Sequence, residues 1–412
     1  MNFAILGTDP DILQLAAAAR NLGNRLTWIG DVRSEDAAAA GPLVVDRTDR
    51  AAEWELLLGH GVVDGVLVGR GTASSDLRAE QLKRLAAEAV PVLVVQPIFE
   101  SVLPYYEIDM ARRETGAVVQ HFNPLVDIPG TGELAEWVRS GHPTAGKIHQ
   151  VTCERRVTSA ARSAVLAHLA RDVELLATVT GDIRRVSAIG PSAAESSFAA
   201  LQVQMTATNI GSLRWSIGSA ATNAAGLQLS LLGERGTITL REQSALDPET
   251  SQWQLEVATD DQPDARQLPP FDAPQLAIKR FAKAAVEANA GARSESSTWE
   301  AATRAMEVVD AIELSLQKGR TIEVFQQHLT EQLAFRGTMA ALGCGLLLLI
   351  FAAAFVIALL GGAEGVIKEK IAPAWPLLLL AVLAFFLFLQ AIPLLAQKRK
   401  SQDDGERPKR AD

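Results

Sequence analysis

The sequence is poor in the residues that build metal centres and disulfide frameworks. Its 412 residues include two cysteines, Cys153 and Cys344, and six histidines with no H-E-x-x-H or Cys/His spacing. Two cysteines so far apart make neither a disulfide framework nor a zinc cluster. The sequence therefore predicts no dedicated metal site, and it favours a reducing compartment.

A basic surface is missing as well. The formal net charge is −9 at pH 7, and no stripe of lysine and arginine runs through the first 335 residues. Nucleic-acid binding requires a basic face and a high isoelectric point, so we expect no nucleic-acid partner.

The N terminus has no basic region, and Asp9 and Asp11 interrupt its apolar residues. It therefore does not resemble a signal peptide.

Charge is absent from two long intervals near the C terminus. No charged residue occurs between Arg336 and Glu364, or between Lys370 and Lys398. Each apolar run exceeds the roughly 20 residues that a helix needs to cross a bilayer. We predict transmembrane helices at 337–362 and 372–396; a buried helical hairpin in a soluble domain is the alternative.

The charges beside these runs predict their orientation. Lys398, Arg399 and Lys400 directly follow the second run and open a basic, polar tail at 397–412. The positive-inside rule places this tail in the cytoplasm. Because two spans return the chain to the same side, we expect residues 1–335 there too, which locates the protein at the cytoplasmic (inner) membrane.

Strands alternate with helices over residues 1–122. Apolar runs at 3–7, 26–31, 62–69, 90–95 and 117–122 predict strands, and helical patterns lie between them. Alternation with short loops is typical of a parallel sheet with helices on both faces. This part of the chain is predicted to be an α/β, Rossmann-like, doubly wound domain.

The pattern changes over residues 123–330. Period-two alternation, as in K-I-H-Q-V-T-C-E-R-R-V, predicts several strands with one exposed face. Helices are expected at about 160–179, 274–289 and 297–319, and the acidic segment 259–274 is expected to be a loop. We predict an α+β domain whose open sheet is largely antiparallel and covered by helices on one face.

A series of segments resembles the Gfo/Idh/MocA family, named after glucose-fructose oxidoreductase and inositol dehydrogenase. They include V-D-G-V-L-V-G, V-P-V-L-V-V-Q-P, H-F-N-P, W-V-R-S-G-H-P-T-A-G-K-I-H-Q-V, L-L-G-E-R-G-T-I-T-L and M-E-V-V-D-A-I-E-L-S-L-Q-K-G-R-T-I-E-V, in the family's order across about residues 1–325. The resemblance implies NAD or NADP in the first domain and a sugar-like or cyclitol substrate against the second sheet. The cofactor positions it implies are Gly7, Thr8, Asp9, Asp31, Gln96 and Pro97.

The cofactor turn departs from the family pattern. Where the family has G-x-G-x-x-G, this sequence has Gly7, Asp9 and Ile12. The middle glycine lets the backbone approach a pyrophosphate, which the helix N terminus then binds. A carboxylate at Asp9 caps that helix and repels phosphate, so the protein is predicted to bind a dinucleotide weakly or not at all. Asp31 suits either a ribose hydroxyl or an ordinary loop.

The family's catalytic positions differ too. The resemblance places Gln96 where the family has a lysine between nicotinamide and substrate. It also places Ala167, Arg171 and Glu174 where the family's helix has Asp, His and Asp. An amide can hydrogen-bond but does not pass a proton, and Gln96 is interpreted first as a turn residue rather than a ligand. No residue is therefore assigned as a secure catalyst.

Two histidines are candidate substitutes for the missing base. His168 lies one turn before Arg171, although a partnership with Asp172, four residues on, is the simpler interpretation. His121 begins H-F-N-P at the end of a strand, and Tyr105 and Tyr106 follow a neighbouring strand. Any of the last three can contact a ligand in the cleft.

Two main hypotheses follow from these patterns. The first is a catalytically degenerate, membrane-anchored member of the fold that acts as a ligand sensor or scaffold. The second is an active NAD(P)-dependent oxidoreductase that acts on a sugar or cyclitol at the cytoplasmic membrane face. A subunit of a membrane complex is a third, and a homo-oligomer is compatible with all three.

Overall fold

The structure is a computed structural model, and it describes residues 1–43, 51–59, 61–192, 195–219, 226–243, 252–259, 264–289 and 298–324. These belong to a compact unit that spans Met1–Gln326. The expected membrane spans at 337–362 and 372–396, and the tail at 397–412, lie outside the described residues. Within those residues no helix has the length and apolar character to span a bilayer.

The first sheet has five strands in the order β2-β1-β3-β4-β5, and all pairings are parallel. Its strands are β1 (Asn2–Leu6), β2 (Arg25–Gly30), β3 (Gly65–Val68), β4 (Val92–Val95) and β5 (Val119–Phe122). The segments between and after them are α1 (Pro10–Asn21), α2 (Ala37–Ala40), η1 (Gly41–Leu43), η2 (Ala51–Leu58), α3 (Ser75–Ala87), α4 (Leu103–Thr115) and η3 (Pro124–Asp127). The predicted doubly wound parallel sheet is confirmed.

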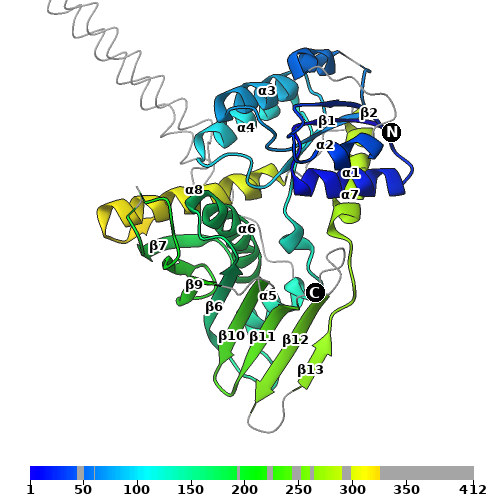
Figure 1. The fold of residues 1–412 in the computed structure, drawn as a ribbon. Coiled ribbons are helices and arrows are strands. Elements are labelled where there is room, and N and C mark those ends of the chain that lie inside the picture. Colours follow the sequence, from blue (N-terminus) through cyan, green and yellow to red (C-terminus); the bar gives the residue numbers. More distant parts are fainter. Residues whose placement is uncertain are drawn as a thin grey trace, which may run out of the picture. The chain divides into compact units, whose positions relative to one another are not determined.

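Alternate residues of these strands enter two different cores. Phe3 and Ile5 of β1 lie in one buried cluster with α1, whereas Ala4 and Leu6 lie in the other. Helix α7 (Ala273–Asn289) joins the first of these clusters, with the ring of Phe281 5.7 Å from that of Phe3. Figure 1 shows α7 beside α1, so the chain returns from the second sheet to cover the first.

The second sheet has nine strands in the order β13-β12-β11-β10-β6-β9-β8-β7-β14. They are β6 (Ile148–Val157), β7 (Ile183–Ile189), β8 (Gln202–Ala207), β9 (Leu213–Ser219), β10 (Gly226–Gly233), β11 (Gly236–Gln243), β12 (Gln252–Thr259), β13 (Asp264–Gln267) and β14 (Ile322–Glu323). Among the described strands of this sheet, β6 and β9 are the one parallel pair, so the expectation of a largely antiparallel sheet is confirmed. The expected loop at 259–274 is wrong in part, because β13 pairs with β12 there.

Three helices contact this sheet: α5 (Thr131–Ser140), α6 (Arg162–Thr180) and α8 (Trp299–Lys318). Figure 1 shows α6 and α8 lying together above β7 and β9. Buried side chains such as Leu169 and Ile312 pack in one cluster with strand residues of both sheets. Helix α8 also contacts α4 and β5, so α6 and α8 lie beside the carboxyl edge of the first sheet.

Candidate functional site

The turn after β1 begins at Gly7, at the edge of the sheet where parallel strands of this architecture bind ligands. Gly7 has a φ of +83°, and its N–H donates to the Gly30 carbonyl at 2.9 Å. Thr8 is fully buried, and its hydroxyl accepts the backbone N–H of Arg33 at 2.8 Å. The side chain of Thr8 is therefore engaged within the protein.

Asp9 occupies the donors that a phosphate would use. Its Oδ1 accepts the N–H of Ile12 at 2.9 Å, and its Oδ2 accepts the N–H of Arg70 at 3.0 Å. Only 1% of Asp9 is exposed. The predicted N-cap of α1 is present, with Pro10 in the first turn. A buried carboxylate thus stands at the positive end of the helix, where an anion would otherwise bind.

Asp31, the residue expected to contact a ribose, is bound by the chain itself. It has a φ of +57°, a left-handed conformation that aspartate tolerates better than most residues. Its Oδ1 accepts the N–H of Thr72 at 2.9 Å as well as the Thr72 hydroxyl. Its Oδ2 accepts the N–H of Ala73 at 3.2 Å and pairs with the guanidinium of Arg78.

The Asp31–Arg78 pair fills the space between two glycine turns. Arg78 is 2% exposed, and its Nη1 donates to Gln81 Oε1 at 2.8 Å. A Cβ added to Gly7 would collide with the Arg78 guanidinium, and one added to Gly71 would collide with the Asp31 carboxylate. A ribose or phosphate approaching Gly7 would have to displace this ion pair.

Arg171 and Arg70 bind the carbonyls at the end of β4. Arg171 Nε donates to the Gln96 carbonyl at 2.6 Å, and Arg171 Nη2 pairs with Asp11 in the first turn of α1. Arg70 Nε donates to the Pro97 carbonyl at 3.0 Å. Arg171, which stands at the family's histidine position, therefore ties α6 to α1 and to β4.

The side chain of Gln96 is buried inside the protein. It is fully buried; the Tyr105 hydroxyl donates to its Oε1 at 3.1 Å, and its Nε2 donates to the Ala302 carbonyl at 3.5 Å. Tyr105 is also fully buried and stacks on Trp299, with ring centroids 5.0 Å apart. Burial raises the pKa of Tyr105 above its ordinary value. Neither side chain can reach a ligand in this arrangement.

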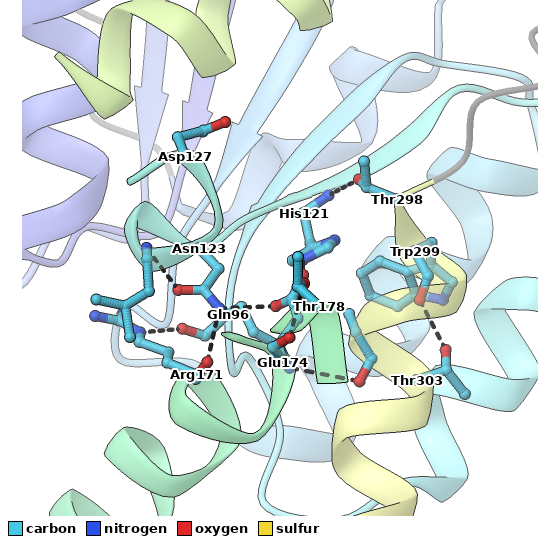
Figure 2. A network of polar contacts seen from close by, with 12 residues as sticks. Gln96, His121, Asn123, Asp127, Arg171, Glu174, Thr178, Thr298, Trp299 and Thr303 are labelled. Carbon is cyan, nitrogen blue, oxygen red and sulfur yellow. Dashed lines mark hydrogen bonds and ion pairs between the residues drawn. The ribbon is translucent and has the colours of Figure 1, made fainter. Parts of the chain in front are cut away.

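His121, Glu174 and Asn123 form a buried polar cluster (Figure 2). His121 Nε2 lies 2.6 Å from Glu174 Oε1, and Asn123 Nδ2 donates to Glu174 Oε2 at 2.8 Å. Asn123 Nδ2 also donates to the Arg171 carbonyl at 3.1 Å. His121 and Glu174 are each 6% exposed. The imidazole and the carboxylate are thus in contact, and Glu174 also lines a cavity of about 190 Å³.

The remaining candidates, His168 and Tyr106, lie outside the polar cluster of His121, Glu174 and Asn123. Burial lowers the pKa of His168 to about 4, with Arg155 as the next cause. The expected partner Asp172 acts on His168 through its charge, but its carboxylate is hydrogen-bonded by Arg155 and by Trp215 Nε1 at 2.9 Å. Tyr106 donates to Glu307 at 2.5 Å, and burial together with this carboxylate raises the pKa of Tyr106.

A cavity of about 500 Å³ lies at the carboxyl ends of β3 and β4, against the first turns of α6. Arg70, Arg78 and Ala167 are among its lining residues, whereas Gly7, Asp9 and Asp31 are not. Sequence reasoning missed Arg70 and Arg78; the arginine in the turn G-R-G-T after β3 was the one available signal.

Within the described residues no cluster of His, Cys, Asp or Glu side chains is arranged to hold a metal ion.

No protein-family model matches the chain, and neither does any curated protein. Solved structures do match. A putative NADPH-dependent oxidoreductase from Desulfitobacterium hafniense superposes with a TM-score of 0.64 at 16% identity, over 78% of this chain and 97% of that one. A 3-ketoreductase from Actinomadura kijaniata, in complex with TDP-benzene and NADP, gives 0.61 at 17% identity, over 76% and 97%.

A third match is an oxidoreductase from Agrobacterium radiobacter in complex with NAD+, L-tartaric acid and magnesium. It gives a TM-score of 0.59 at 12% identity, over 79% of this chain and 98% of that one. The described chain has the fold of Gfo/Idh/MocA-type NAD(P)-dependent oxidoreductases. The expected fold of the two described domains, a parallel Rossmann-like sheet followed by a mostly antiparallel one, is thereby confirmed. At this identity the likeness concerns the fold alone.

Proposed function

We propose that this protein is a non-catalytic descendant of the oxidoreductase fold, which acts as a ligand sensor or scaffold at the inner face of a membrane. The observation that carries the proposal is the Asp31–Arg78 pair between Gly7 and Gly71. Together with Asp9 on the α1 N terminus, it fills positions that a dinucleotide would need. The residues present therefore do not fit NAD or NADP.

The family's catalytic positions support the same proposal. Gln96 is enclosed by Tyr105 and Ala302, Arg171 binds a backbone carbonyl, and Glu174 pairs with His121. Positioned acid–base help contributes typically 10²–10⁴-fold to a rate. We infer that Gln96, Arg171 and Glu174, each bound by other groups of the protein, do not serve as the base that takes a proton from a substrate hydroxyl.

An active oxidoreductase that acts on a sugar or cyclitol is the second candidate. Two observations favour it: the matched structures from Actinomadura kijaniata and Agrobacterium radiobacter hold NADP and NAD+, and a cavity of about 500 Å³ lies beside β4. It requires Arg78 to leave Asp31 when a cofactor binds. We place it second because that movement would leave a buried carboxylate without its cation.

Binding of NADH decides between the two. The full-length chain is titrated with NADH and NADPH, and nicotinamide fluorescence is measured. We expect no saturable binding below about 1 mM, the range of very weak complexes. Micromolar binding would support the oxidoreductase instead.

Membrane attachment belongs to this proposal through the apolar runs at 337–362 and 372–396. Two spans of that length insert stably. We expect the full-length chain to stay in the membrane fraction after a high-salt wash, and a chain that ends at Gln326 to be released. Recovery of the full-length chain in the soluble fraction would contradict the anchor.

A membrane protein or a second copy of the chain is the macromolecular partner that fits such a scaffold.

A further inference from the structure

We propose that the cavity at the ends of β3 and β4 binds a small organic anion, a phosphate ester or carboxylate with an apolar body. This inference rests on the proposed function and names the ligand class of the sensor. The cavity has a volume of about 500 Å³, within the range of small-molecule sites. Its lining comes from the loops after β3 and β4, the first turns of α3 and α6, and α8.

One wall of the cavity is cationic. Arg70 makes no ion pair with any described residue, and its Nη2 is buried without a hydrogen-bond partner. Arg78, which is 2% exposed, likewise has an unpartnered Nε although its other nitrogens are bonded. Buried donors that lack an acceptor are unfavourable, and those on a charged group most of all. Burial and the nearby Arg171 lower the pKa of Arg70, and the charges of Asp9 and Asp11 offset this only in part.

Two helix N termini reach the same cavity. Ser75 is the first residue of α3, and Ser163 and Ala164 belong to the first turn of α6. Helix α6 spans 19 residues and has no side-chain cap. Among the described residues, the backbone N–H groups of Ser163 and Ala164 have no acceptor. Free N–H groups and the helix dipole both favour a bound anion.

The rest of the lining is largely apolar, which is why we infer an organic ligand. It includes Pro97, Ile98, Phe99, Leu166, Ala167 and Met306. One carboxylate, Glu100, also lines the cavity, but its side chain is 66% exposed and pairs with Arg162 at 3.5 Å. An inorganic ion would contact only the cationic part of the lining. A ligand with an apolar body would contact the cationic and the apolar parts.

The test uses phenyl phosphate as the probe and the full-length chain, with binding measured by calorimetry. The uncharged analogue phenol is the matched control ligand. We expect phenyl phosphate to bind saturably and phenol to bind much more weakly. The Arg70→Gln variant should bind phenyl phosphate roughly tenfold to a hundredfold more weakly, the usual effect of removing a hydrogen bond to a charged group.

A second pair of variants avoids the buried arginines. Ser163→Asp places a carboxylate at the exposed N terminus of α6, where it favours the helix and opposes the ligand. We expect this variant to lose phenyl phosphate binding, whereas the nearly isosteric Ser163→Asn retains it. Arg84→Gln, an exposed change near the other end of α3, should leave binding unchanged.

Equal affinity in Ser163→Asp and Ser163→Asn would overturn the proposal, as would absence of binding to the unmodified chain. The outcomes separate the two proposals. If neither NADH nor phenyl phosphate binds, the non-catalytic assignment stands and the anion site fails. If NADH binds at micromolar concentration, the non-catalytic assignment fails whatever phenyl phosphate does.

Discussion

At the scale of single residues, the central feature is the ion pair of Asp31 with Arg78 at the edge of the first sheet. An aspartate at the end of the second strand suits a ribose hydroxyl in dinucleotide-binding folds. Here the same carboxylate accepts bonds from Thr72, Ala73 and Arg78. The carboxylate oxygens of Asp31 therefore accept hydrogen bonds from groups of the protein itself.

This assignment predicts a large effect on stability for Asp31→Asn. The change leaves the guanidinium of Arg78 buried without its carboxylate, and breaking a buried pair in this way destabilises by about 3–5 kcal/mol. The measurement is the free energy of unfolding in urea, followed by tryptophan fluorescence. The matched control is Glu55→Gln, which breaks the exposed pair with Arg84 and should change stability by about 0–1 kcal/mol. Equal effects of the two changes would show that Asp31 has no structural role.

The sequence predicted some of these contacts and missed others. The cap of α1 by Asp9 was predictable because a cap is local: donor and acceptor lie three residues apart. The partner of Asp31 lies 47 residues away in an amphipathic helix, where an arginine is normally assigned to the solvent face. Only the packing of α3 on the sheet brings the two together.

At the scale of elements, the N terminus of helix α1 is stabilised by two carboxylates. Its first turn holds Asp9 as the cap and Asp11, which pairs with Arg171 of α6. Both carboxylates stabilise the helix N terminus, and under the proposed function they oppose the binding of a phosphate there. Under that function, contacts to neighbouring elements take the place of a ligand.

Substitution of Asp9 tests this account of α1. Asp9→Ala removes the cap and leaves the N–H of Arg70 without an acceptor, so we expect a loss of about 0.5–2 kcal/mol. Asp9→Asn keeps a capping oxygen and should lose less. Thermal unfolding of both variants, monitored by circular dichroism, gives the comparison. Equal losses would mean that the charge, rather than the cap, is what matters.

Elements with strong periodicity were predictable, and those without it were not. The strands of the first sheet are short apolar runs, and the helices α6, α7 and α8 lie within a few residues of their expected positions. Strand β13 was missed because all four of its residues are exposed and three of them, Asp264, Arg266 and Gln267, are polar, which is typical of a loop. The packing of α7 on α1 depends on contacts between distant segments, so no local pattern indicates it.

At the scale of the whole molecule, the two sheets keep the order of the oxidoreductase fold while the groups at the edge of the first sheet bind one another. Asp11, Arg171 and the Gln96 carbonyl link α1, α6 and β4, and Figure 2 shows Arg171 beside Gln96. Fold alone does not establish function. Under the proposed function, the chain is a scaffold with a cavity of about 500 Å³ at the edge of its first sheet.

The measurement that tests the central claim most directly is a nicotinamide fluorescence titration of the full-length chain beside its Asp31→Ala variant. A site closed by its own ion pairs predicts no saturable NADH signal from either protein below about 1 mM. Micromolar binding by the unmodified chain that disappears in Asp31→Ala would contradict the account, because Asp31 would then bind a ribose and Arg78 would have to leave it.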